Sequence, residues 1–250
     1  MRVNDTVTGH RLLRGAIHPG GAVILRLPDL RQLGVIGSDI AEIVALALEQ
    51  SVVRDRFTGT AVLTRDQAAD LDALGYVARA SGLAVDARHD HPFLSSEFPR
   101  TVHGHTEGDV LSRFLVRAEE AAVSVGLITA LAGDLGDHRG STPTDPLPAP
   151  GKPRSGVGIV EGWRGTIVHR VHRVHRVHRV HRVHRVHRVH RVHRVHRVQL
   201  AADGTLSRVK IVDPSFFNWP ALPVALTDTI VPDFPLANKS FNLSYAENDL

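Results

Sequence analysis

Two short runs of histidine are the first residues whose types and spacing suit chemistry, in this case metal binding. His89 and His91 flank Asp90, and a second run is His103-Gly104-His105. Imidazole and carboxylate groups are common ligands of zinc and similar metals. Both runs lie in a polar segment without periodic apolar residues to hold them in place, which favours solvated loop histidines over ligands.

A perfect tandem repeat is the densest run of titratable residues. Residues 168–197 are ten copies of Val-His-Arg, which hold ten of the 17 histidines and ten of the 30 lysines and arginines. A period of three spreads the valines around a helix and alternates them between the faces of a strand. Polyproline II would align them, but nothing would bury the valine edge, and arginines ~9 Å apart would repel one another. We therefore expect a disordered or extended tract.

Three interpretations of this tract are open. The perfect identity of its copies favours a neutral tandem expansion. Ten arginines would also attract a polyanion such as nucleic acid or anionic lipid. Ten imidazoles would suit nickel, zinc or copper, although without a fixed geometry. If the tract has no function, deletion of nine copies leaves activity, assembly and salt-dependent binding unchanged.

The tract also decides the net charge. The chain carries +4 from 30 basic and 26 acidic residues, but outside the repeat the balance is 20 against 26, or −6. The overall charge is therefore no argument for a nucleic-acid-binding body. Because the chain has no cysteine, it can provide no disulfide, thiolate zinc site or iron–sulfur ligand.

Nothing in the sequence indicates a membrane span. The most apolar runs, Ile40–Leu48 and Val123–Ala132, are too short to cross a bilayer. The polar start Arg2–Thr6 is not followed by the apolar stretch of a signal peptide. We expect a chain that is soluble or peripherally attached.

Three helices are expected in the first half of the chain. Asp39 is a candidate cap for a helix through Ile40–Leu48, and a second helix is expected from Thr64 to Ser81-Gly82. A third begins at Asp109 and is the most periodic. Its expected core positions are Val110, Phe114, Leu115, Ala118, Ala121, Ala122, Val125 and Leu127.

Strand-like sequence follows a segment rich in proline. Strands are expected at Gly156–Val160, Gly165–Val168 and Leu206–Val212, with a hairpin turn at Asp203-Gly204. When nine repeat units are left out of the sequence, the flanking residues keep the alternating pattern of a β-hairpin. The tract is therefore interpreted as an insertion into one strand of that hairpin.

These elements predict an α+β fold. Its parts are a helical bundle at residues 1–133, a linker rich in Pro and Gly at 134–155, and an α+β region at 156–250. The last region contains a small β-hairpin and the low-complexity insert at 168–197.

Several segments, in this order and spacing, resemble a known family. The family comprises the large subunits of group 4 nickel–iron hydrogenases, such as the formate hydrogenlyase large subunit, and the related D subunit of respiratory complex I. The chain resembles the C-terminal half of these proteins. The segments that carry the resemblance are Thr8–Arg11, Ile17–Gly21, Ala78–Gly82, Asp86–Arg88 with Pro92, Gly108–Val110, Ser112–Arg117 with Glu119, Glu161–Gly165, Arg208–Lys210 and Asp213–Trp219.

The chain departs from the hydrogenases at their terminal metal motif. The resemblance places Ser244 and Glu247 where the two last cysteine ligands would stand. A nickel–iron centre needs soft thiolates, which a hydroxyl and a carboxylate cannot replace. We therefore expect no metal site, as in the related complex I protein, which keeps the fold without these cysteines.

The resemblance also implies four cavity residues: Arg164, Pro214, Ser215 and Asn218. The corresponding arginine overhangs the hydrogenase metal site, and a guanidinium is a permanently charged donor suited to a polar cavity. The alternative for Arg164 is that it pins its turn through carbonyl bonds. The alternative for the other three is a role as turn and cap residues.

The resemblance implies a subunit of a membrane-associated NADH:quinone oxidoreductase-like or hydrogenase-like complex. Its role would be electron transfer from an NAD(P)H- or formate-linked donor toward quinone, without a nickel–iron centre. The implied partners are an iron–sulfur small subunit and membrane subunits, and the implied location is cytoplasmic, peripheral to the plasma membrane. Quinone and NAD belong to the complex, whereas the chain itself has no Gly-rich dinucleotide fingerprint and is expected to bind no cofactor and to be inactive alone.

Two other functions remain open. One is a non-catalytic scaffold or assembly remnant, as a truncated family member. The other is polyanion binding through the His/Arg repeat.

Overall fold

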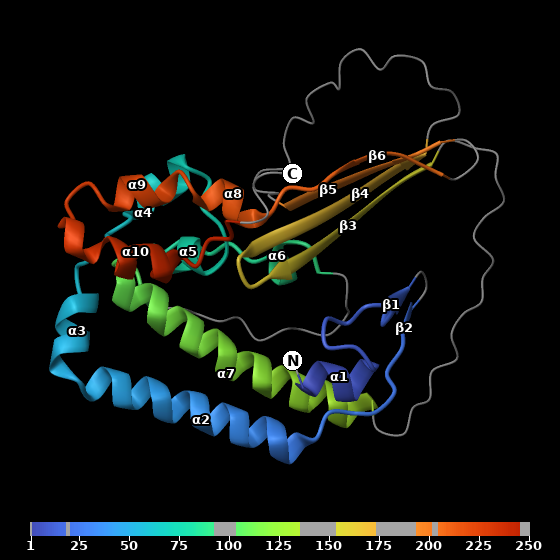
Figure 1. The fold of residues 1–250 in the computed structure, drawn as a ribbon, viewed down its shortest axis with the longest axis horizontal. Coiled ribbons are helices and arrows are strands. Elements are labelled where there is room, and N and C mark those ends of the chain that lie inside the picture. Colours follow the sequence, from blue (N-terminus) through green and yellow to red (C-terminus); the bar gives the residue numbers. More distant parts are fainter. Residues whose placement is uncertain are drawn as a thin grey trace, which may run out of the picture. The chain divides into compact units, whose positions relative to one another are not determined.

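The computed structural model describes residues 2–18, 21–92, 104–135, 154–173, 194–201 and 205–245 (Figure 1). The chain forms two compact units, Met1–Ala47 with Ala118–Ala149, and Leu48–Arg117 with Pro150–Leu250. Its helices and small four-stranded sheet confirm the predicted α+β class. Among the described helices, none combines the length and the hydropathy needed to cross a membrane.

The first unit consists mainly of two long helical segments. It contains most of α2 (Leu30–Glu49) and the C-terminal part of α7 (Val110–Leu135), together with α1 (Arg2–Thr8) and the paired strands β1 (Ile17–His18) and β2 (Gly21–Ala22). The two long segments pack closely, since a Cβ added to Gly37 would lie 3.5 Å from the Val125 side chain.

The predicted start of α2 at Asp39 is wrong. The helix begins at Leu30, and Asp29 caps it by accepting hydrogen bonds from the backbone N–H groups of Arg31 (2.9 Å) and Gln32 (3.3 Å). The glycines at 34 and 37, which indicate a loop in the sequence, lie inside the helix.

The second unit holds the remaining helices, most of which are short. They are α3 (Ser51–Phe57), α4 (Arg65–Asp70), α5 (Gly75–Ala80), α6 (Ala87–Asp90), α8 (Pro214–Asn218), α9 (Ala221–Ala225), the 3₁₀ helix η1 (Val231–Asp233) and α10 (Phe234–Phe241).

The helix predicted from Thr64 to Gly82 is two helices, α4 and α5. Its start is confirmed, because Thr64 and Gln67 form a reciprocal capping box. Between the two helices, Asp72 (φ 51°) and Gly75 (φ 58°) adopt the left-handed conformation, which interrupts the helical hydrogen bonding.

The third predicted helix is α7, which begins at Val110, next to the predicted start at Asp109. The Asp109 carboxylate accepts a hydrogen bond from the Ser112 N–H at 2.7 Å. Val110 is buried as predicted, but Phe114 and Leu115 are only half-buried and Ala122 is exposed. The buried face instead includes Ser112 and Arg113, which apolar periodicity could not indicate.

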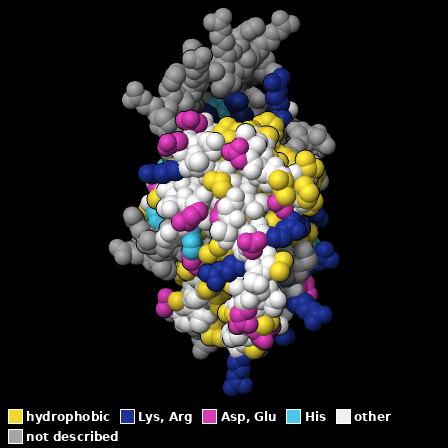
Figure 2. Space-filling model, turned by 90° about the vertical axis from the view of Figure 1, so that its left-hand side faces the viewer, with side chains coloured by type: hydrophobic (Ala, Val, Ile, Leu, Met, Phe, Trp, Pro, Cys, Tyr) yellow, Lys and Arg dark blue, Asp and Glu magenta, His cyan; other side chains and the backbone are white. Residues whose placement is uncertain are grey.

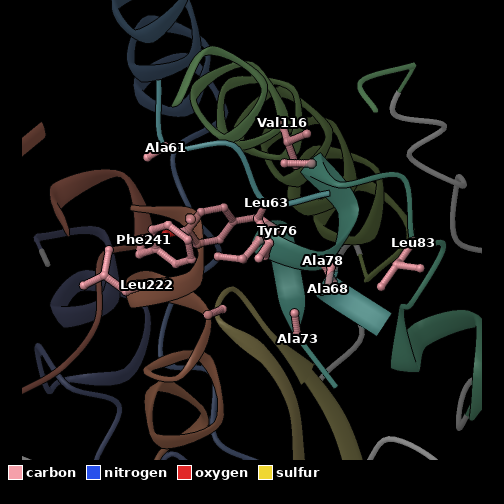
Figure 3. Close-up of a cluster of buried hydrophobic side chains, with 14 of the residues drawn as sticks. Ala61, Leu63, Ala68, Ala73, Tyr76, Ala78, Leu83, Val116, Leu222 and Phe241 are labelled. Carbon is pink, nitrogen blue, oxygen red and sulfur yellow. The ribbon is translucent and has the colours of Figure 1, made fainter. Parts of the chain in front are cut away.

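A hydrophobic cluster forms the core of the second unit. It combines the loop before α4, helices α4 and α5, the first turns of α7, and the C-terminal helices α9 and α10 (Figure 3). Tyr76 and Phe241 are its largest side chains, and both are almost completely buried. Gly108 (φ 67°) lies at a tight approach, since a Cβ there would be 1.9 Å from the Leu63 carbonyl oxygen.

Strands β3 (Arg154–Gly162), β4 (Gly165–Arg173), β5 (Arg194–Leu200) and β6 (Leu206–Lys210) form the sheet in that order (Figure 1). The three predicted strand segments are confirmed. The predicted turn at 203–204 lies outside the described residues, but β5 and β6 pair as a hairpin around it.

The repeat enters the sheet in a way that the sequence did not predict. It supplies the end of β4 and the start of β5, rather than an insertion into one strand, and these two strands pair in parallel. Identical residues lie side by side: Val168 with Val195, His169 with His196, and Arg170 with Arg197. The residues between β4 and β5 lie outside the described part of the chain, as does most of the predicted linker.

Candidate functional site

A buried ion pair joins two of the segments that carry the family resemblance. Arg79, in α5, donates from Nη1 to Glu161 Oε1 at 3.0 Å, and both side chains are only 5% exposed. The same Nη1 donates to the Val85 carbonyl oxygen at 2.8 Å. The pair therefore ties α5 to the end of β3 and to the loop before α6.

Glu161 has both carboxylate oxygens occupied. Its Oε2 accepts hydrogen bonds from the Ala87 N–H (3.0 Å) and the Thr166 hydroxyl (3.1 Å). Burial raises the pKa of Glu161, and the attraction of Arg79 and the hydrogen bonds oppose that rise. Three sequence segments, at 78–82, 86–88 and 161–166, meet at this carboxylate.

Asp86 and Arg88 form a second, adjacent pair. Both Asp86 oxygens accept from the Arg88 guanidinium, with Nη2 to Oδ2 at 2.6 Å and Nε to Oδ1 at 3.0 Å. Burial pushes the pKa of Asp86 upward, but the hydrogen bonds and charge of Arg88, with the charge of Arg79, hold it below its ordinary value. Asp86 also caps α6 through the Arg88 N–H at 2.9 Å.

The start of α5 holds the turn between β3 and β4. A Cβ on Gly75 would lie 2.4 Å from the carbonyl carbon of Arg164, so only glycine fits there. Asn218 secures the preceding residue, because its Oδ1 accepts from the Leu74 N–H at 2.9 Å and its Nδ2 donates to the Leu74 carbonyl at 3.3 Å. Arg164 and Asn218, both predicted cavity residues, thus both lie against the backbone of Leu74 and Gly75.

Arg164 extends from this turn toward aromatic rings. Its guanidinium carbon lies 4.9 Å from the centre of the Trp163 ring, and its Nε is buried without a hydrogen-bond partner among the described residues. Trp163 is 49% exposed and stacks on Tyr76, with ring centres 6.0 Å apart. Arg117 also lies over both rings, at 5.4 Å from Tyr76 and 5.2 Å from Trp163.

Pro214 and Ser215 are buried at the first turn of α8. The Asp213 carboxylate caps this helix, accepting from the Ser215 N–H at 2.8 Å. The Ser215 hydroxyl accepts from the Ser244 N–H at 2.9 Å, and the Ser244 carbonyl accepts from Trp219 Nε1 at 3.2 Å. The structure therefore brings Ser244 against the predicted cavity residue Ser215, whereas Glu247 lies outside the described residues.

The histidine runs gain no partners for a metal ion. Within the described ranges, no group of three or more His, Asp or Glu side chains is arranged to hold one. His89 lies in α6 with a buried Nε2 that has no hydrogen-bond partner, and His103 is outside the described part of the chain.

Several buried polar residues of this region were not singled out by sequence reasoning. Arg79, Asp86 and Glu161 stand in the resembling segments, which was the available signal. Arg113 is completely buried, and it donates to the carbonyls of Gly108 (2.6 Å) and Ala61 (2.9 Å) and to the Ser240 hydroxyl (2.9 Å). Burial lowers its pKa to about 10.

The family model for the respiratory-chain NADH dehydrogenase 49 kDa subunit matches residues 1–250. The chain belongs to this family. This confirms the resemblance drawn from the motif segments, three of which converge on Glu161.

Curated relatives include hydrogenases and quinone oxidoreductase subunits. The carbon monoxide-induced hydrogenase of Rhodospirillum rubrum is 29% identical over 80% of this chain and 48% of its own length. Formate hydrogenlyase subunit 5 of Escherichia coli is 27% identical over 100% of this chain and 40% of its own. An NADH-quinone oxidoreductase subunit of Phocaeicola vulgatus is 30% identical over 52% of this chain and 26% of its own. The chain thus spans half or less of the length of these relatives.

A solved structure shares the fold. It is the membrane-bound sulfane sulfur reductase, described as an archaeal respiratory membrane complex, with a TM-score of 0.72 at 23% identity. The match covers 100% of this chain and 63% of that one.

Proposed function

We propose that the chain is a subunit of a membrane-associated, complex I-like or hydrogenase-like redox complex that transfers electrons toward quinone without a nickel–iron centre. The family match over the whole chain carries this proposal. The names of its relatives join hydrogenases with quinone oxidoreductases, which supports a redox complex as the shared context.

The residues of this chain do not fit a nickel–iron centre. Such a centre needs soft thiolate ligands, and the chain contains no cysteine. Ser244, at one of the equivalent positions, uses its backbone N–H and carbonyl to hold Ser215 and Trp219. These backbone hydrogen bonds give Ser244 a structural role, and we assign no chemical step to a metal.

Arg164 fits a ligand with an acceptor oxygen. Its buried Nε–H lacks an acceptor among the described residues, and a buried donor without an acceptor destabilises the fold. A quinone, when bound, accepts electrons and presents carbonyl oxygens to such a donor. The partly exposed ring of Trp163 supplies an apolar surface beside it. In this proposal Arg164 orients the quinone, and Asn218 with Gly75 positions the turn that carries Arg164.

NAD contact is assigned elsewhere in the complex. The sequence has no Gly-rich dinucleotide fingerprint, and the described part of the chain has no parallel α/β sheet of the kind that binds dinucleotides. The proposed partners are an iron–sulfur small subunit and membrane subunits, which would hold the chain at the membrane surface.

Copurification tests the assembly. The full chain, tagged at its chromosomal locus, is purified from detergent-solubilised membranes and its companions are identified by mass spectrometry. We expect an iron–sulfur protein and integral membrane subunits in a stable ratio. A chain that purifies as a monomer without partners would overturn the proposal.

Quinone reduction in membranes tests the role of Arg164. NADH and formate are supplied separately as donors, with a short-chain quinone as acceptor, and Arg164→Met is compared with Arg65→Met, an exposed arginine on α4. We expect Arg164→Met alone to lower the rate by at least about tenfold, the loss typical of one oriented donor, while the assembly on a native gel is unchanged. Equal rates in both variants would instead favour the non-catalytic scaffold.

A further inference from the structure

One face of the four-stranded sheet carries basic side chains that line up across neighbouring strands. β4 pairs with β5 so that Arg170 lies beside Arg197, and β5 pairs with β6 so that Arg197 lies beside Lys210. Residues paired in this way project from the same face. Three cations therefore form a row across three adjacent strands.

A second row lies two residues further along the strands. It consists of His172, Gln199 and Arg208, which are paired in the same manner. All the basic members of the two rows are exposed except Arg170, which is half-buried. We call the surface made by Arg170, His172, Arg197, Arg208 and Lys210 the basic sheet face.

Almost no negative charge balances this face from within the sheet. Glu161 is the only acidic residue in β3, β4, β5 and β6, and its carboxylate is paired with buried Arg79. The face shown in Figure 2 differs, because basic and acidic side chains are interspersed there. The four strands therefore give this face an excess of positive charge.

The arrangement costs stability unless an anion is present. Neighbouring strands are about 4.8 Å apart, well within a Debye length of ~8 Å, and like charges directly opposite each other destabilise a sheet. The described ion pairs involve neither Arg170 nor Arg197. An array of negative charges would remove this repulsion, which makes a multivalent anion the fitting ligand.

We propose that the basic sheet face binds the surface of a membrane that contains anionic phospholipids. The two rows form a two-dimensional array, which suits a plane of phosphate headgroups. Val157 pairs with Arg170 in the first row and is 61% exposed, so an apolar side chain lies beside the cations, as is common at membrane surfaces. The four strands contain no Phe, Tyr or Trp side chain on which a nucleic-acid base could stack.

This inference goes beyond the proposed redox function and does not depend on it. The redox proposal depends on partner subunits and on Arg164, whereas this one depends on a direct contact of the chain with lipid. The two can therefore fail separately.

Vesicle binding by the purified full chain tests the proposal. The vesicles contain equal parts of phosphatidylglycerol and phosphatidylcholine, and binding is measured by cosedimentation in ~0.1 M salt. The test variant is Arg170→Gln/Arg197→Gln, and the matched control is Arg54→Gln/Arg65→Gln, which removes the same charge from exposed positions on α3 and α4. Far-UV circular dichroism confirms that both variants are folded.

We expect the wild type and the control to bind alike, and the test variant to bind about 25-fold more weakly. That factor follows from roughly fivefold per basic residue at an anionic surface. An equal loss in both variants, or equal binding to vesicles of phosphatidylcholine alone, would overturn the proposal. So would tighter binding to a duplex oligonucleotide than to the vesicles, because it would assign the face to nucleic acid.

Discussion

Arg79 and Arg170 show two opposite ways to place a guanidinium in one compact unit. Arg79 is buried and meets acceptors already held in place, the Glu161 carboxylate and the Val85 carbonyl. Arg170 lies beside Arg197 on a neighbouring strand, and among the described residues no carboxylate forms an ion pair with either. The buried ion pair of Arg79 stabilises the folded chain. The repulsion between Arg170 and Arg197 destabilises it, and a bound anion would weaken that repulsion.

The contrast between Arg79 and Arg170 follows from the kind of sequence segment to which each belongs. Arg79 belongs to a family segment whose partners lie in two other family segments, so acceptor and donor occur together. Arg170 belongs to a repeat that contains no acidic residue. Its neighbours across the strands are Val157 of β3 and its own copy Arg197 of β5, and neither is acidic.

The largest expected effect comes from breaking the buried pair. Arg79→Met leaves the Glu161 carboxylate buried without its guanidinium partner, which typically costs about 3–5 kcal/mol of unfolding free energy. Urea denaturation measures it, with exposed Arg65→Met as the control, expected within ~0.5 kcal/mol of the wild type. A loss below ~1 kcal/mol for Arg79→Met would mean that the pair is solvated and that the contrast with Arg170 fails.

Gly75→Ala should cause the second-largest loss of unfolding free energy. A Cβ there meets the Arg164 carbonyl carbon at 2.4 Å, and the left-handed backbone adds about 1–2 kcal/mol of its own. We expect a total loss of at least ~2 kcal/mol. Gly126→Ala is the matched control, because a Cβ in that helix meets nothing within 4 Å and should stabilise by ~0.5–1 kcal/mol. Equal melting temperatures for the two variants would contradict the close approach at the turn.

Opposite pH dependences should distinguish the two carboxylates of the buried cluster. The pKa of Asp86 is lowered, so its stabilisation is present above the unfolded pKa and is lost as pH falls through the folded value. The pKa of Glu161 is raised, so its contribution is greatest below the unfolded pKa and is lost as pH rises through the folded value.

Denaturation of Asp86→Asn and Glu161→Gln between about pH 3 and 7 tests this pair of signs. We expect the free energy of unfolding of Asp86→Asn to fall relative to that of the wild type as pH rises through the acid range. The free energy of unfolding of Glu161→Gln should rise relative to that of the wild type as pH rises above ~4.5. Parallel profiles in the two variants would show that the carboxylates share one environment.

The smallest effect is expected on the basic sheet face. Replacing both arginines in Arg170→Gln/Arg197→Gln removes a like-charge pair and should stabilise the chain by ~0.2–1 kcal/mol at low ionic strength. Because salt screens exposed charges, the gain should disappear near ~1 M salt. Thermal unfolding at both ionic strengths measures it, and a destabilised variant at low salt would show that the two side chains do not repel each other.

The sequence predicted elements better than it predicted their ends or pairings. The helix starts at Thr64 and Asp109 and the strand segments are local signals, and each is confirmed. The predicted start of α2 is misplaced because Asp39 is a candidate cap in the sequence, whereas Asp29 caps the helix and Gly37, inside it, lies close to Val125. The parallel pairing of β4 with β5 could not be inferred, since a perfect repeat offers many equivalent registers.

The candidate site was only partly predictable, for a similar reason. Arg164, Pro214, Ser215 and Asn218 follow from the family resemblance, and their roles there remain a proposal. Two partners of Glu161, Ala87 and Arg79, lie 74 and 82 residues away in the sequence, and the distances that join them arise only from the fold. Arg113 stands in a segment that carries the resemblance, but nothing in the sequence indicates that it is a buried cation bonded to Gly108 just before its helix and to Ala61 and Ser240, which lie 52 and 127 residues away.

The in-register pairing of β4 with β5 makes the topology of the sheet depend on the number of repeat units. Twenty residues separate Arg173 from Arg194, and they must return along seven paired residues, or about 23 Å of strand. A parallel return needs about a dozen residues. We therefore expect the parallel pairing to survive the loss of two units but not of several more, because the remaining connection would be too short. On this expectation, the copy number of the repeat sets a length threshold for the pairing of β4 with β5.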